Sequence, residues 1–220
     1  MKKLIILLLL LVGCASNRIL VSNSINSKIT RGYVASVSIT TEDGRVFGSG
    51  TIIRNKRAEY LAVITAAHVI RSMQKRNIDI YILTAYSVKT KLMHVSKIND
   101  GFDLALLIGN SKEVSDGPYV KVSNKFPSIG DSIWAIGAPL GDQLTVTRGI
   151  VSNFEKEKTK KLYRITAEIF YGNSGGGLFN EQNELIGVVH AMKYVQQGFS
   201  VLLVPGAGFA ISLENIRMFL

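Results

Sequence analysis

The chain has 220 residues, of which 47% are apolar and 19% are charged. This composition supports one or two compact units and excludes a disordered, highly charged protein. Because the chain has three histidines and a single cysteine, Cys14, an intramolecular disulfide is excluded and a structural zinc site is disfavoured. The net charge of +10 favours anionic partners without identifying one.

The chain begins with a basic, leucine-rich segment that ends at its single cysteine. Lys2 and Lys3 precede an apolar run over residues 4–12, which is too short to cross a bilayer. A basic segment, a short apolar segment and a small residue before the cleavage point together form a secretion signal. We therefore predict a signal peptide over residues 1–13.

Residues 11–14, Leu-Val-Gly-Cys, resemble the cleavage box of bacterial lipoprotein signals. The resemblance implies that Cys14 is acylated, that residues 14–32 form a lipidated N-terminus and tether, and that the protein is anchored to a membrane and faces the periplasm or the exterior. Ala15 would direct a Gram-negative lipoprotein to the outer membrane. The alternatives are an ordinary signal peptide and a buried core cysteine.

Short strands separated by turn residues are predicted from Tyr33 onward. Residues 33–40 alternate with a period of two, and an amphipathic helix is predicted over residues 213–220, with one further helical turn after His68. The charged run 155–161 (EKEKTKK) is predicted to be a solvated hairpin tip. The other predicted strands cover 45–53, 60–65, 78–85, 88–97, 104–108, 132–136, 143–151, 161–168, 177–179 and 185–194.

Many short strands at this spacing predict an all-β fold rather than an alternating α/β fold. We predict two antiparallel β-barrels, the first over residues 33–117 and the second over residues 118–220, which includes the C-terminal helix.

Three segments place a reactive side chain among small residues: His68 in Thr-Ala-Ala-His, Asp103 in Asp-Leu-Ala-Leu, and Ser174 in Gly-Asn-Ser-Gly-Gly. A serine hydroxyl is a poor nucleophile until a base takes its proton, and histidine is suited to that task near neutral pH. The imidazole in turn needs a carboxylate to fix its tautomer. Glycines beside Ser174 allow backbone N–H groups to converge on an oxyanion.

These three segments, in the order His, Asp, Ser, resemble the trypsin-like serine proteases and, within them, the HtrA/Deg group. Supporting matches are Gly-Ser-Gly-Thr at 48–51, Thr-Arg-Gly-Ile-Val at 147–151 and Gly-Phe-Ala-Ile at 208–211. The resemblance implies two six-stranded barrels with an active site between them. It assigns Ser174 as nucleophile, His68 as general base and acid, and Asp103 as orienting carboxylate. The N–H groups of Gly172 and Ser174 would form the oxyanion hole.

The Gly-x-Ser-x-Gly pattern around Ser174 also fits the nucleophile elbow of α/β-hydrolases. That fold needs an acid and then a histidine after the serine. No aspartate follows Ser174, and His190 comes only sixteen residues later. We therefore set the elbow interpretation aside.

The sequence departs from the trypsin-like pattern at several positions. Asn173 replaces the aspartate that pairs with a new N-terminus in zymogens, and we expect no PDZ module after residue 220. Glu168, six residues before Ser174, is a candidate base of the substrate pocket that would attract Lys or Arg, whereas HtrA-type enzymes prefer small aliphatic residues. The alternative is that Glu168 faces solvent. His190 is a second candidate for the substrate pocket. The alternatives are that its side chain approaches Asp103 or that it is a core histidine.

We therefore predict a serine endopeptidase that acts through an acyl-enzyme on exposed or unfolded envelope polypeptides, without a metal or cofactor. The alternative is a catalytically inactive pseudoprotease that serves as an envelope binding module. Because the basic residues are dispersed and no nucleic-acid-binding motif is present, no nucleic-acid partner is predicted. The HtrA resemblance also allows a homotrimer.

Overall fold

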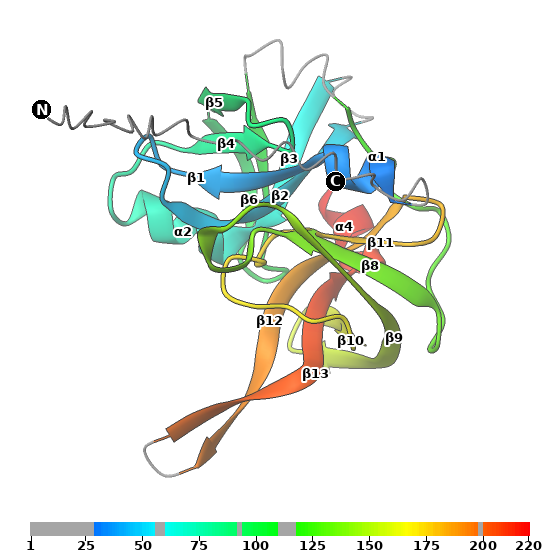
Figure 1. Cartoon of the computed structure of the whole chain (residues 1–220). Helices are drawn as coiled ribbons and strands as arrows, with labels where there is room; N and C mark the ends of the chain where they lie inside the picture. The colour runs from blue at the N-terminus through cyan, green and yellow to red at the C-terminus, as the bar shows by residue number, and fades with distance from the viewer. Residues whose placement is uncertain (1–28, 56–59, 92–93, 110–117, 198–199) are drawn as a thin grey trace, which may run out of the picture.

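The computed structural model describes residues 29–55, 60–91, 94–109, 118–197 and 200–220 (Figure 1). The predicted signal peptide and Cys14 therefore lie outside the described residues. Within the described ranges, no helix is long and apolar enough to span a membrane.

The first unit is a seven-stranded antiparallel sheet with two short helices. Its strands follow the order β5-β4-β1-β2-β3-β7-β6. The edge strands β5 and β6 are separated in the chain only by residues 92 and 93, so the sheet curls until its two edges approach each other. The elements are α1 (Thr30–Val34), β1 (Ser36–Thr40), β2 (Val46–Asn55), β3 (Tyr60–Ala66), α2 (Ala67–Gln74), β4 (Tyr81–Thr84), β5 (Lys89–Lys91), β6 (His94–Asn99) and β7 (Leu104–Ile108).

The second unit is a closed barrel in the order β10-β13-β12-β11-β8-β9. The helix α4 follows the last strand, and the paired strands β12 and β13 extend beyond the rest of the barrel (Figure 1). The elements are β8 (Ser132–Gly137), the 3₁₀ turn η1 (Pro139–Gly141), β9 (Thr145–Glu157), β10 (Lys160–Ile165), β11 (Gly177–Phe179), β12 (Leu185–Gln197), β13 (Ser200–Ser212) and α4 (Leu213–Phe219).

The all-β prediction is confirmed, and so are the closed second barrel and the C-terminal helix. The first unit differs in detail, because the predicted strand 88–97 divides into β5 and β6, which pair with different neighbours. Tyr33, the predicted start of the first barrel, lies in α1, and β1 begins at Ser36. The strand β13 was not among the predicted strands.

One of the two hydrophobic clusters of the described residues spans both units, and the other lies within the second barrel. A single buried cluster includes Ile39 and Ile52 of the first sheet together with Phe179, Leu185 and other residues of the second barrel. Burial of such side chains is the main favourable term in folding, at about 25 cal/mol per Å² of apolar surface. The shared core therefore holds α2 and the ends of β3 and β7 in a fixed position against the loops of the second barrel.

Candidate active site

Asp103 lies directly before β7 and at the N-terminus of α2. Its carbonyl oxygen accepts a hydrogen bond from the Ala67 N–H at 3.0 Å, and its Oδ1 accepts one from the His68 N–H at 2.9 Å. A carboxylate satisfies free N–H groups at a helix N-terminus and interacts favourably with the helix dipole. Asp103 therefore stabilises the start of α2 and at the same time fixes the backbone position of His68.

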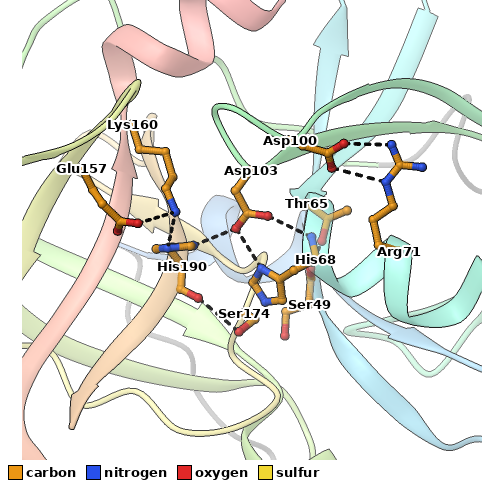
Figure 2. Close-up of polar contacts among 10 residues, drawn as sticks. All are labelled: Ser49, Thr65, His68, Arg71, Asp100, Asp103, Glu157, Lys160, Ser174 and His190. Carbon is orange, nitrogen blue, oxygen red and sulfur yellow. Dashed lines mark hydrogen bonds and ion pairs between the residues drawn. The ribbon is translucent and has the colours of Figure 1, made fainter. Parts of the chain in front are cut away.

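The second oxygen of Asp103 accepts hydrogen bonds from two imidazole rings (Figure 2). Nδ1 of His68 lies 2.8 Å from Oδ2, and Nδ1 of His190 lies 2.7 Å from the same atom. Burial of Asp103 raises the pKa of its carboxyl group, but the hydrogen bonds from His190 and then His68 outweigh this effect and hold that pKa well below its usual range. The Asp103 carboxylate is therefore charged whenever the protein is folded near neutral pH.

His190 reaches Asp103 because β12 contains a β-bulge at this residue. Val189 pairs with Ala210 and Ala191 pairs with the next residue, Phe209, so His190 is the extra residue of the longer strand. A bulge breaks the period-two alternation and turns a side chain toward a new direction. One of the two alternatives from the sequence, that His190 approaches Asp103, is the one found in the structure.

Ser174 lies in the loop before β11, beside the His68 ring (Figure 2). Its Oγ donates a hydrogen bond to the His190 carbonyl oxygen at 3.4 Å, and within the described residues it makes no hydrogen bond to the His68 ring. Both side chains line one cavity of about 370 Å³. Because Nδ1 of His68 is directed at Asp103, its Nε2 is the atom that a rotated Ser174 hydroxyl would meet.

The segment 170–173 forms a tight turn next to Ser174. The Asn173 N–H donates to the Phe170 carbonyl at 3.0 Å, and Gly172 has φ of +96°, which is the arrangement of a type II turn. The Tyr171 carbonyl accepts a hydrogen bond from the Leu140 N–H at 2.6 Å. Since N–H and C=O point in opposite directions across a trans peptide, the Gly172 N–H points away from Leu140.

Ser49 of β2 connects the first sheet to this loop. Its Oγ donates to the Gly172 carbonyl at 2.7 Å, and its N–H donates to the Ser174 carbonyl at 2.8 Å. The neighbouring position 48 has room only for glycine, because a Cβ there would lie 2.6 Å from a Val69 methyl carbon and 2.8 Å from the Ser174 carbonyl oxygen. The Gly-Ser-Gly-Thr motif at 48–51 is therefore the part of the first sheet that supports the Ser174 loop.

Glu168 is exposed and follows β10. It lines a small cavity of about 100 Å³ with Ile169, Phe170 and Met192, and it is not among the residues that line the larger cavity around His68 and Ser174. The smaller cavity is mostly apolar in its lining residues. Glu168 therefore faces solvent, as the alternative from the sequence had it, and does not form the base of the larger cavity.

His68, Asp103 and His190 also offer three atoms within 4.8 Å of one another, a spacing found in metal sites. The atoms of this cluster are already engaged in hydrogen bonds, and the Lys160 ammonium lies 3.2 Å from Nε2 of His190. A cation at this place would be repelled by that ammonium group. The arrangement favours a hydrogen-bonded cluster over a cation site.

The sequence of this chain matches the family model of the trypsin-like peptidase domain over residues 48–188. Among curated proteins, it is 30% identical to the serine protease Do-like HtrA of Bacillus subtilis over 207 residues, which cover 87% of this chain and 42% of that protein. The chain spans less than half the length of the curated relatives it matches.

Two solved structures illustrate the similarity of the fold. A serine endoprotease from Yersinia pestis superposes with a TM-score of 0.66 at 26% identity, covering 87% of this chain and 63% of the other. The HtrA-type protease AlgW with a decapeptide superposes with a TM-score of 0.69 at 21% identity, covering 87% of this chain and 65% of the other.

The fold and the site thus define a trypsin-like β-barrel protein with a His-Asp pair beside a serine. The chain belongs to the family of trypsin-like peptidase domains, and it resembles the HtrA proteases within that family.

Proposed function

We propose that this protein is a serine endopeptidase in which Ser174, His68 and Asp103 form the catalytic triad. The carrying observation is the cluster in which Asp103 holds both the backbone and the ring of His68, next to the Ser174 hydroxyl. Family membership and the similarity to HtrA proteases support the same function.

In the proposed reaction the Ser174 hydroxyl rotates from the His190 carbonyl toward Nε2 of His68. His68 takes the hydroxyl proton while Oγ bonds to the substrate carbonyl carbon, whose C=O opens to the oxyanion of a tetrahedral intermediate. His68 then gives the proton to the leaving amine as the intermediate collapses, which breaks the peptide bond and leaves the acyl ester on Ser174. Water next loses a proton to His68 and attacks the ester through a second tetrahedral intermediate. When the ester C–O bond breaks, His68 returns the proton to Oγ, which releases the acid and restores Ser174. Asp103 stabilises the imidazolium in both steps.

The oxyanion of each tetrahedral intermediate would be bound by the N–H groups of Gly172 and Ser174. The type II turn over residues 170–173 supports this role, because the Leu140–Tyr171 hydrogen bond directs the Gly172 N–H away from Leu140 and Gly172 itself lines the cavity that contains His68. Preformed donors of this kind contribute strongly to acyl transfer. The same turn counts against the pseudoprotease alternative, which needs a distorted oxyanion loop.

We propose exposed or unfolded polypeptide segments as substrates, by analogy with the AlgW structure, which contains a decapeptide. The cavity between Phe170, Met192 and the exposed Glu168 would receive the side chain that precedes the cleaved bond. We further propose that the protein acts in the cell envelope, held by a lipid on Cys14. A DegP-like relative from Buchnera aphidicola is described as periplasmic, which agrees with this location.

The test is hydrolysis of casein by the wild type, by Ser174→Ala and by Ser128→Ala. Removal of the nucleophile should lower kcat by about 10⁶-fold, which abolishes measurable cleavage. Ser128 is an exposed serine of the second unit, so its variant should match the wild type. Cleavage that persists in Ser174→Ala would place the nucleophile elsewhere, and an inactive wild type would favour the binding module.

A further inference from the structure

The geometry around His190 points to a positioning function that involves Lys160. We infer that Lys160 keeps His190 as a neutral imidazole with its proton on Nδ1, and that His190 in this form is a second hydrogen-bond donor that positions Asp103. The catalytic consequence rests on the proposed function, whereas the protonation state itself does not.

The argument begins with the hydrogen-bonding capacity of the groups. Nζ of Lys160 lies 3.2 Å from Nε2 of His190 (Figure 2). An ammonium group has three donors and no acceptor, so Nε2 must accept the hydrogen bond and carries no proton. The ring proton is then on Nδ1, where it is donated to Oδ2 of Asp103 at 2.7 Å. A proton on Nε2 would place two cations in contact.

Lys160 is held in this position by its surroundings. Its side chain is only 16% exposed, and its ammonium lies 3.4 Å from a carboxylate oxygen of Glu157. The two residues face each other across the β9–β10 hairpin, whose register pairs Lys160 with Glu157. The charged run 155–161 does form a hairpin tip as predicted, but one of its lysines is directed inward at the site.

Several elements contribute charged or titratable groups around the His190 ring. Asp103 and His68 approach it from the first unit, and Lys160 and Glu157 approach it from the β9–β10 hairpin. His190 also lines a cavity together with Glu155, Lys156 and Lys193. Of these groups, Asp103 and Lys160 are the two that hydrogen-bond the ring.

The neutral state matters because the two histidines share one carboxylate oxygen. As a neutral donor, His190 holds Asp103 in place and leaves the carboxylate charge to stabilise the His68 imidazolium. As a cation, His190 would form its own ion pair with Asp103. The two charged rings, whose centroids are 5.9 Å apart, would then repel each other. By keeping His190 neutral, Lys160 leaves the Asp103 carboxylate with a single cationic partner, the His68 imidazolium.

Three variants test whether Lys160 itself controls the protonation of His190 or whether the loss of any positive charge on the hairpin has the same effect. Lys160→Met removes the ammonium group, and Lys160→Arg retains a cation that cannot accept a hydrogen bond. Lys161→Met is the matched control, because Lys161 lies on the same hairpin, pairs with Glu214 and is half exposed. Each variant is measured by NMR of ¹⁵N-histidine-labelled protein, with His190 assigned by comparison with His190→Gln, and by the pH dependence of kcat/KM on a peptide substrate.

In the wild type, Lys160→Arg and Lys161→Met, we expect the Nε2 resonance of His190 near neutral pH to be that of an unprotonated nitrogen, because the cation at position 160 is a donor only. In Lys160→Met, where the neighbouring cation is removed, Nε2 should take up a proton at a higher pH than in the wild type. The fall in kcat/KM between pH 8 and pH 6 should then exceed that of the wild type by about tenfold, since the new cation opposes the His68 imidazolium.

A proton on Nε2 of His190 in the wild type near neutral pH would overturn the inference, and so would identical titrations of Lys160→Met and Lys161→Met. If Lys160→Met does not fold, the wild-type NMR measurement and Lys160→Arg still decide the protonation state. An inactive wild type would contradict the proposed endopeptidase without affecting the NMR result.

Discussion

Gly172 shows at the residue scale how the backbone beside Ser174 depends on a single missing side chain. Its φ is +96°, and a Cβ at this position would lie 2.2 Å from the Ala138 carbonyl oxygen. A side chain would therefore force the turn and its N–H group to move. We expect Gly172→Ala to lower kcat by about 100-fold or more, the scale found when one oxyanion donor is lost.

Gly130→Ala is the matched control for this substitution. Gly130 also has a positive φ, of +94°, but it lies in an exposed turn where a Cβ would meet nothing within 4 Å. Both substitutions strain the backbone, and only the one at Gly172 disturbs the site. Peptidase assays on the two folded variants should therefore differ, and equal kcat values would contradict the proposed role of the Gly172 N–H.

The side chains that we propose as catalytic could be predicted from sequence because each lies in a short motif whose residues fix the local backbone. Asp103, for example, stabilises the start of the helix that carries His68, so the two motifs depend on each other. The inward position of Lys160 could not be proposed in this way. It depends on a hairpin register and on a bulge in another strand, and a run of charged residues gives no sign of either.

At the scale of elements, Tyr163 connects β10 to the helix α4. Its Oη accepts a hydrogen bond from the Leu213 N–H at 3.1 Å, and the N-cap Ser212 accepts one from the Asn215 N–H. Burial raises the pKa of Tyr163 to about 12, from 10.0. Because the folded-state pKa is raised, the associated stability is fully present below about pH 10 and is lost as the pH rises to about 12.

We expect Tyr163→Phe to lower the free energy of unfolding at pH 7 by about 1 kcal/mol, since the Leu213 N–H loses its acceptor. The free energy of unfolding of the wild type should fall between about pH 10 and 12 as the Tyr163 phenol ionises, and the variant should lack this contribution to the fall. Urea unfolding at pH 7 measures the first effect, and urea unfolding at about pH 10 and about pH 12 measures the second. Tyr86→Phe, which removes an exposed phenol, is the control. A variant with the full wild-type pH dependence would contradict the assignment.

The elements themselves were predictable where a residue pattern determines them. The helix over Leu213–Phe219 follows from its amphipathic spacing, and most strand positions follow from short apolar runs between turns. The strand β13 carries Pro205 and two glycines, which weaken a strand pattern, and pairing with β10 and β12 forms it nevertheless. The bulge at His190 is likewise a product of pairing with β13, which local sequence does not encode.

At the scale of the whole molecule, the site depends on contacts between the two units. His68, in α2, and Asp103, directly before β7, belong to the first unit, and Ser174, His190 and Lys160 belong to the second unit. Asp103 accepts hydrogen bonds from both units, and Ser49 donates hydrogen bonds across the same boundary. The order of the His68, Asp103 and Ser174 motifs predicted that the two halves of the chain would meet at one site. The seven strands of the first sheet could not be counted from the sequence, because their number depends on how the strands pair.

The most direct measurement of the central claim is labelling of the wild-type protein with a fluorophosphonate, followed by peptide mass spectrometry to locate the adduct. An activated serine reacts with such a reagent, whereas ordinary serines do not. We expect one adduct, on Ser174, whose formation is strongly slowed in His68→Ala. No adduct on the folded wild type, or an adduct on another residue, would contradict a peptidase built on His68, Asp103 and Ser174.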